Sequence, residues 1–207
     1  MPPEVRDLPL FPLPLVLLPT EVVPLHIFED RYKEMIGLCL EEQRDFGIVW
    51  LSDSGLKEIG CTASVAEVLE QMEDGRMNIL VRGGTPFRLL EKQGEHAYPA
   101  GTVEILGDQQ VADPEETGGE ARERYADLLE SLTEERPEDS ALAELSAYEM
   151  AATVDIEPEV KQGLLELRSE GARLRLLARL FKAGIKWVAR AREVADRATG
   201  NGMVDVH

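Results

Sequence analysis

Prolines cut the opening of this chain into short apolar pieces, and this pattern restricts its folding more than any other feature. A proline has no backbone N–H for a helix interior, and it pushes the preceding residue away from helical geometry. The segment from Leu8 to Ile27 therefore cannot be one helix. We expect short strands in which the prolines occupy sheet edges or bulges. These prolines are Pro9, Pro12, Pro14, Pro19 and Pro24.

The same prolines, together with the first charges, argue against two common uses of an apolar N-terminus. A helix that spans a bilayer needs about 20 predominantly apolar residues without such interruptions. A secretory signal peptide has a basic region at its N-terminus, whereas the first charged residues of this chain are Glu4, Arg6 and Asp7. We therefore expect a cytoplasmic protein without a membrane partner.

The cysteines indicate neither a disulfide framework nor a metal site. Cys39 and Cys61 form no C-x-x-C pair, and no histidine stands at the spacing of zinc ligands. A chain of 207 residues can also bury a sufficient core without covalent staples. We expect both thiols to be buried and reduced, and we expect no cofactor.

After the opening, the period of the apolar residues changes. Between Glu29 and Glu42 they recur every three or four residues, which predicts one amphipathic helix. The apolar run at 46–51 predicts a buried strand, and Asp74-Gly75 predicts the turn of a hairpin. We expect Gly83-Gly84 to break the second arm of that hairpin, and a last strand to follow at 101–107.

A change in composition near residue 110 divides the chain. Acids, glutamines, a proline and paired glycines replace apolar residues there, and helical spacing follows. We expect a β-rich domain at 1–112, a linker at 113–119 and a helical domain at 120–207. Within the last, Pro158 stands at the favoured first-turn position of a helix, and a long helix is expected at about 172–198.

One segment is basic in an otherwise acidic chain. The formal net charge of −18 opposes nucleic-acid binding, yet residues 168–197 hold nine basic and three acidic side chains. Five basic residues recur at helical spacing and share one face. That face is a solvated surface, a docking surface for an acidic partner or a second copy, or a contact for RNA or an anionic membrane. The five are Arg175, Arg179, Lys182, Lys186 and Arg190.

Several motifs together resemble a known family. They are L-P-L-F-P at 8–12, P-x4-P-L-x-I-F-E-x-R-Y at 19–32, D-G-R-x-N-I at 74–79 and D-I-E-P-E-V-K-Q-x-L-L-E at 155–166. The combination is similar to the N-terminal substrate-binding domain of the ATP-dependent Lon protease. The resemblance implies an α+β fold: a PUA-like β-pseudobarrel with one helix, followed by an α-helical bundle that ends in a long helix. It also implies a part that helps to recognise unfolded or tagged proteins and supports assembly.

The motifs of the catalytic modules of such a protease do not occur in this sequence. Gly83-Gly84 and Gly118-Gly119 lack the lysine and hydroxyl residue that complete a nucleotide-binding loop. No serine lies in a G-x-S-x-G nucleophile motif. We predict a non-enzymatic module that binds proteins or peptides, as an adaptor in protein quality control beside a protease or chaperone partner. An RNA-associated accessory module that uses the basic helix is the alternative, and self-association is left open.

The opening motif also supplies the candidate binding residues, because its prolines can keep apolar side chains from packing inward. For Glu29, Arg31 and Tyr32 the alternative is a structural role at the start of a helix. For His26 the alternative is an ordinary surface histidine. The candidates are Leu13, Leu15, Val23, His26, Phe28, Glu29, Arg31 and Tyr32.

Overall fold

A computed structural model describes residues 3–94, 96–109 and 115–200. The chain divides into two compact units. The barrel unit comprises Met1–Gln110 and Tyr148–Ser169, and the helical unit comprises Val111–Ala147 and Glu170–His207. Each unit is therefore built from two separate stretches of the chain. The expected simple division near residue 112 did not include this return of the chain to the barrel.

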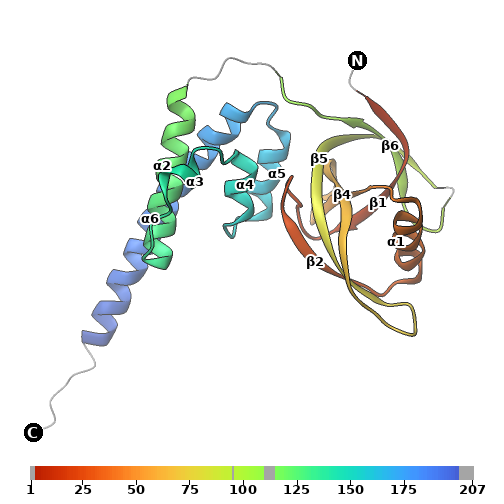
Figure 1. Cartoon of the computed structure of the whole chain (residues 1–207), viewed down its shortest axis with the longest axis horizontal. Helices are drawn as coiled ribbons and strands as arrows, with labels where there is room; N and C mark the ends of the chain where they lie inside the picture. The colour runs from red at the N-terminus through yellow and green to blue at the C-terminus, as the bar shows by residue number, and fades with distance from the viewer. Residues whose placement is uncertain (1–2, 95, 110–114, 201–207) are drawn as a thin grey trace, which may run out of the picture. The chain divides into compact units, whose positions relative to one another are not determined.

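Five strands of the barrel unit close into a ring, and a sixth is added at its edge (Figure 1). The sheet order is β2-β5-β4-β3-β1-β6, and an additional β5–β6 pairing closes the ring. Among the strands of the described residues, β1 and β3 are the only parallel neighbours; the other neighbours are antiparallel. The strands are β1 (Glu4–Leu13), β2 (Val22–Ile27), β3 (Phe46–Ser52), β4 (Gly55–Gln71), β5 (Met77–Gln93) and β6 (Ala100–Ile105).

The proline-rich opening forms β1 and β2, as its pattern predicts, although Pro9 and Pro12 lie within β1, which has a partner strand on each side and is no edge strand. Within the described sheet β2 pairs only with β5, so it is an edge strand, and it contains Pro24. An edge strand tolerates a proline because one side of its backbone needs no partner. Between β1 and β2 the chain buries Leu17 and Leu18. This proline-flanked part of the opening therefore packs into the core instead of remaining outside it.

The predicted hairpin at Asp74-Gly75 is present, but its second arm does not break at Gly83-Gly84. Strand β5 runs through both glycines, and the β4–β5 register shifts between Cys61 and Ala63. A Cβ atom on Gly83 would lie 1.9 Å from the carbonyl oxygen of Leu18, and one on Gly84 would lie 2.5 Å from Thr62 Oγ1. Glycine is therefore required for close approach, and the expected break was wrong.

Helix α1 (Asp30–Glu42) follows β2 and covers part of the barrel. It begins one residue after the predicted start and buries Tyr32, Met35, Ile36 and Cys39, which lie on the predicted apolar face. Its last residue is followed by Gln43 in the left-handed conformation, which ends the helix. This helix fixes the position of Glu29, Arg31 and Tyr32 at one end of the barrel.

Helix α5 (Pro158–Glu166) contains the E-P-E-V-K-Q motif and belongs to the barrel unit. Lys161 Nζ lies 2.5 Å from Glu21 Oε1, and Gln162 Nε2 donates to the carbonyl oxygen of Ile59 at 3.1 Å. Both contacts join α5 to the first half of the chain. The short helix α4 (Ala147–Ala152) precedes it, and Tyr148 Oη donates to the carbonyl oxygen of Leu164.

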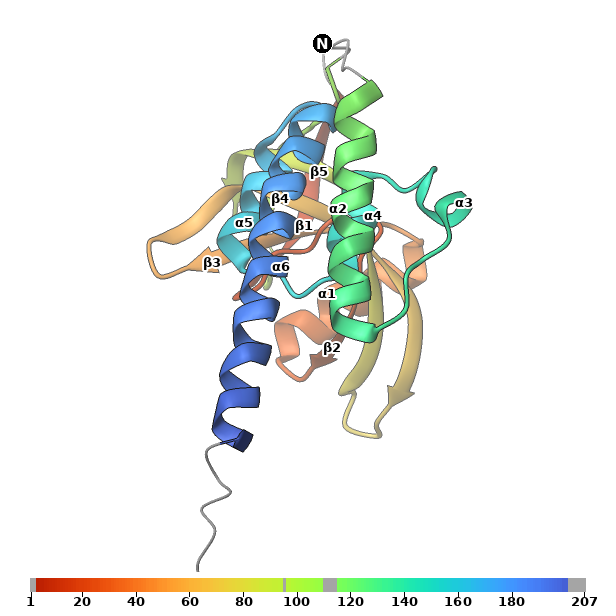
Figure 2. The same cartoon turned by 90° about the vertical axis from the view of Figure 1, so that its left-hand side faces the viewer.

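The helical unit consists of α2 (Glu115–Thr133), α3 (Asp139–Leu142) and α6 (Glu170–Gly200). In Figure 2, α2 and α6 lie side by side, and the rings of Tyr125 and Phe181 are 5.5 Å apart. Because α2 begins at Glu115, it includes most of the segment expected to be a linker; residues 113 and 114 lie outside the described residues. None of the described helices is long and apolar enough to cross a membrane.

Candidate functional site

The barrel unit carries a groove of about 670 Å3 at the end where β1 and β2 finish. Its lining comes from four places in the sequence: residues 10–14, residues 26–32, the β3–β4 turn and the β5–β6 connection. The ring closure brings these segments together, because β1 pairs with β6 and β3 pairs with β4. The groove is thus a product of the barrel, although its largest contribution comes from the opening motif.

Aromatic side chains form the floor and one edge of the groove. Phe11 and Tyr32 are 6% and 5% exposed, and their ring centroids lie 4.1 Å apart at an interplanar angle of 31°. Phe28 is 60% exposed and Leu51 is 50% exposed, although both line the groove. An exposed aromatic ring and an exposed leucine beside an aromatic floor can receive apolar side chains of a ligand.

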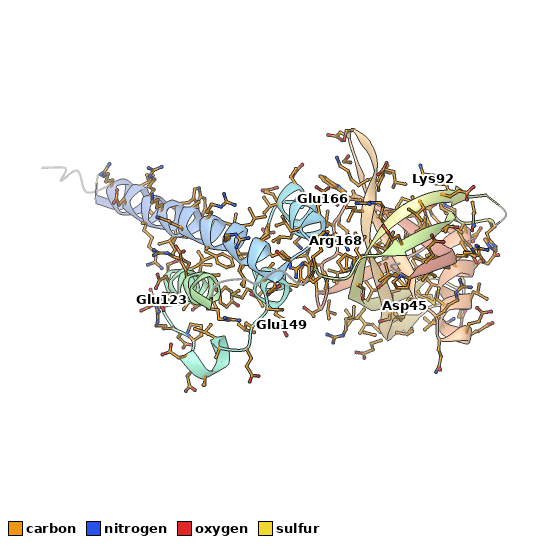
Figure 3. All side chains as sticks on the ribbon, turned by 90° about the horizontal axis from the view of Figure 1, so that it is seen from above. Asp45, Lys92, Glu123, Glu149, Glu166 and Arg168 are labelled. Carbon is orange, nitrogen blue, oxygen red and sulfur yellow. The ribbon has the colours of Figure 1, made fainter. Side chains whose placement is uncertain are left out.

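An ion pair stands beside this aromatic floor. Arg31 Nη2 lies 2.7 Å from Glu29 Oε2, and the Arg31 guanidinium carbon lies 4.6 Å from the centroid of the Tyr32 ring. Burial raises the pKa of Tyr32, and the positive charge of Arg31 opposes that rise only in part. The Glu29 carboxylate does not cap α1 by a side-chain hydrogen bond. It accepts a hydrogen bond from Arg31 Nε instead. Lys92, near the end of β5, adds a second cation to the lining (Figure 3).

His26 also lines the groove and is held by a hydrogen-bond chain. Its Nδ1 is 2.7 Å from Asn78 Oδ1, and Asn78 Nδ2 donates to Glu70 Oε2 at 2.9 Å. Because the Asn78 amide nitrogen donates to Glu70, the Asn78 oxygen accepts a hydrogen bond from the Nδ1–H of His26. The imidazole also stacks on Phe28, with centroids 5.8 Å apart at an interplanar angle of 21°. This stacking holds Phe28 at the groove while leaving most of its ring exposed.

Six of the eight candidate binding residues line the groove, namely Leu13, His26, Phe28, Glu29, Arg31 and Tyr32. The other two, Leu15 and Val23, are half-buried and are not part of the lining. Val23 is opposite Val81 in the β2–β5 ladder. The groove therefore brings most of the candidates together, and their role in binding stays a prediction.

The sequence did not indicate the part of the lining that comes from Leu51, Leu56, Lys92, Gln93 and Pro99. Leu51 and Leu56 flank the β3–β4 turn and are paired with each other in the sheet. Leucines beside a turn are ordinary core candidates in a sequence, so their pattern carried no sign of exposure. Only the closed barrel places them beside the opening motif.

The five residues of the basic face are all exposed on α6, which belongs to the helical unit. Arg179 Nε donates to the carbonyl oxygen of Arg175 at 3.3 Å. Lys182, Lys186 and Arg190 form no ion pair with any side chain in the described part of the chain. This face is a second surface, separate in composition from the aromatic groove.

Both thiols are buried, which makes them poor nucleophiles. Burial raises the pKa of Cys39 to about 11 and raises the pKa of Cys61 further still. A thiol must ionise to attack a substrate or bind a metal, and these groups resist ionisation. Among the described residues, no group of three or more histidine, cysteine or carboxylate side chains could hold a metal ion.

The chain matches the profile of the ATP-dependent protease La (LON) substrate-binding domain over residues 7–183. It belongs to this family. The match spans the barrel and most of the helices, as the opening and E-P-E-V-K-Q motifs predicted. Substrate recognition is therefore the general function that this membership supports.

Among individual relatives, the chain is 26% identical to the Lon protease of Paraburkholderia phytofirmans, over 94% of this chain and 26% of that protein. It is also 26% identical to the Lon protease of Anaeromyxobacter dehalogenans, over 84% of this chain and 23% of that protein. The chain thus spans about a quarter of the length of these relatives.

Two solved structures share the fold. The Lon N-terminal domain protein of Xanthomonas campestris matches with a TM-score of 0.64 at 23% identity, over 84% of this chain and 97% of that one. The N-terminal domain of the Mycobacterium avium complex Lon protease matches with a TM-score of 0.63 at 20% identity, over 86% of this chain and 98% of that one. The predicted α+β class and family are both confirmed.

Proposed function

We propose that this chain is a non-catalytic module that binds unfolded or tagged polypeptides in the groove of its barrel unit. The observation that carries the proposal is the exposed Phe28 at a groove of about 670 Å3 with an aromatic floor. Apolar side chains of a folded protein are mostly hidden, whereas an unfolded chain presents them. A groove of this kind therefore favours unfolded segments over native surfaces.

The groove also suggests which peptides bind best. Phe11 and Tyr32 offer a buried aromatic floor, while Arg31 and Lys92 add cations beside it. We expect extended segments with aromatic or large aliphatic side chains, and a preference for a nearby acidic residue over a basic one. In a cytoplasmic setting this selectivity suits an adaptor that delivers substrates to a separate protease or chaperone.

Titration with a fluorescent peptide rich in aromatic and aliphatic residues tests this function. Removing the Phe28 side chain in Phe28→Ala should weaken binding by about tenfold, because a large part of the aromatic contact is lost. Leu51→Ala should weaken it by roughly fivefold. Since Phe28 and Leu51 are 60% and 50% exposed, neither change should lower stability by more than about 0.5 kcal/mol.

The matched control is Leu90→Ala. Leu90 is 49% exposed, lies on β5 and is not part of the groove lining. Its removal deletes the same atoms as Leu51→Ala at nearly the same exposure, so binding should not change. Equal losses in Leu90→Ala and Leu51→Ala, or full binding by Phe28→Ala, would refute the groove as the binding site.

The alternative, an RNA-associated module, draws its support from the exposed basic face of α6. It predicts retention of single-stranded RNA that falls steeply with rising salt. Filter binding at low salt tests it, and the net charge of −18 leads us to expect no retention.

A further inference from the structure

Helix α6 has a second apolar stripe besides the one that packs on α2. Phe181 and Gly184 lie on the stripe that contacts Tyr125 and Leu128 of α2. A different set of apolar residues follows at intervals of three and four residues and so forms another line along the helix. This outer stripe consists of Leu176, Leu180, Ala183, Trp187, Ala191 and Val194.

The outer stripe is largely uncovered within the described residues. Trp187 is 71% exposed and Val194 is 64% exposed, and Ala183 and Ala191 are also exposed. Helix α6 has 31 residues and α2 has 19, and both views show α6 continuing past the end of α2 (Figures 1 and 2). A contiguous line of exposed apolar side chains marks an interaction surface, whereas a single exposed tryptophan would not.

The basic face adjoins this stripe from Leu176 to Ala191, whereas Glu193 precedes Val194. Lys182 and Lys186 precede Ala183 and Trp187 by one residue each, and Arg190 precedes Ala191. Helix geometry places each of these cations about 100° from its neighbour, at the border of the stripe. The three have no acidic partner among the described side chains. At the start of the face, Arg175, Arg179 and Lys182 line a shallow hollow of about 570 Å3 with Ala178 and Glu120.

We infer that the outer stripe and basic face together dock an acidic amphipathic helix of another protein. The apolar side of that helix covers Trp187, and its acidic flank pairs with Lys182, Lys186 and Arg190. This is the arrangement by which helices select partners: a packed apolar seam supplies affinity and flanking charges supply specificity.

The observations favour this occupant over two others. Pairing of α6 with α6 of a second copy would bring two basic flanks together, and like charges oppose such a contact. RNA would meet the cations and could stack on Trp187, but its phosphate backbone offers no apolar surface to cover Ala183, Ala191 and Val194. An acidic helix satisfies both the apolar stripe and the cations.

The experiment uses the full chain carrying Trp50→Phe, which leaves Trp187 as its sole tryptophan. The probe is a synthetic peptide of about 28 residues with leucines on one side and glutamates at both flanks. The control probe carries lysines in place of the glutamates. Titration of the glutamate peptide should move the Trp187 emission to shorter wavelength as the stripe is covered, and raising the salt should weaken binding. The lysine peptide should not bind.

Variants of the chain locate the contact. Lys186→Glu should weaken binding of the acidic peptide by about fivefold, because an attractive pair becomes a repulsive one. Arg6→Glu changes the net charge equally on an exposed part of β1 and should leave binding unchanged. By fluorescence anisotropy of labelled peptide, Trp187→Ala should weaken binding by at least about tenfold, whereas Leu132→Ala, at 52% exposure on α2, should not.

Three results would overturn the inference. One is no binding of the acidic peptide up to about 100 μM, with folding verified by circular dichroism. Another is equal binding of both peptides. The third is occupation of the stripe by something else: self-association abolished by Trp187→Ala, or RNA retention abolished by Lys186→Glu. The groove variant Phe28→Ala should bind the acidic peptide normally, which separates this surface from the proposed function.

Discussion

Gly83→Ala is a substitution for which the structure predicts a large loss of stability. The added Cβ would lie 1.9 Å from the Leu18 carbonyl oxygen and 3.2 Å from Leu17 Cγ. Both leucines are almost fully buried, so the segment cannot move aside without opening the core. Two backbone hydrogen bonds of 2.9 Å join β5 to this segment at the same point. Gly83 N–H donates to the carbonyl oxygen of Glu21, and Thr20 N–H donates to the carbonyl oxygen of Gly83. The substitution must therefore strain the contact or separate the two segments.

The expected cost follows from these contacts. Overpacking of a rigid site costs about 1–3 kcal/mol, and each hydrogen bond that lengthens or breaks adds about 0.5–1.5 kcal/mol. We expect Gly83→Ala to lower the free energy of unfolding by about 3 kcal/mol. The matched control is Gly37→Ala within α1, where an added Cβ meets no atom within 4 Å. Alanine should raise stability there by roughly 0.5–1 kcal/mol, because it restricts the unfolded chain.

Urea unfolding, followed by Trp50 fluorescence in a Trp187→Phe background, reports on the barrel unit alone. Gly83→Ala should shift the midpoint downward without changing the slope. If both glycine variants had the same stability, or if Gly83→Ala stayed within about 0.5 kcal/mol of the parent, the close approach of β5 to the Leu18 segment would be refuted.

Two further predictions concern the barrel unit. Lys161→Ala should lower the free energy of unfolding by about 3 kcal/mol, because it leaves the buried Glu21 carboxylate without its cation, and limited proteolysis should then release α5. The control Lys33→Ala breaks an ion pair with the exposed Asp30 and should lower the free energy of unfolding by less than about 0.5 kcal/mol. Equal losses in the two variants would contradict the role of the buried pair. Cys39 should stay unmodified by a thiol reagent near neutral pH until urea unfolds the chain. Its pKa rises from 9.0 to about 11 on folding, so the folded state binds more protons and stability should fall as pH rises from about 9 to 11. Cys39→Ala should reduce that fall without abolishing it, because folding also raises the pKa of Cys61, and rapid labelling of Cys39 in the native protein would contradict its burial.

Local signals in the sequence predicted several elements well. Apolar spacing defined α1 to within one residue of its start, and Asp74-Gly75 marked the β4–β5 turn. Both signals are local in sequence. The helix follows from the spacing of its own apolar residues, and the turn follows from the left-handed conformation that Gly75 adopts. The family motifs likewise indicated the fold, because they contain residues that the barrel requires.

Glycine pairs were harder to interpret, since the same residue serves opposite purposes. Gly83-Gly84 permits close contact inside β5, and Gly118-Gly119 lies inside α2, although both pairs resembled interruptions. What separates these uses is the atom that stands opposite the missing Cβ. At Gly83 and Gly84 that atom belongs to Leu18 and Thr62, which are distant in sequence and leave no trace in the local pattern, whereas a Cβ on Gly119 would meet no atom within 4 Å.

The proline-cut opening shows which properties of this protein could be predicted from its sequence and which could not. The sequence by itself determined that residues 8–27 form strands with bends, that a helix follows, and that the chain resembles the Lon substrate-binding domain. Only the tertiary structure decided that Phe28 stands exposed beside Leu51 and that α5 returns to Glu21. Backbone geometry and spacing are local properties, whereas exposure and long-range contacts depend on which strands close the ring.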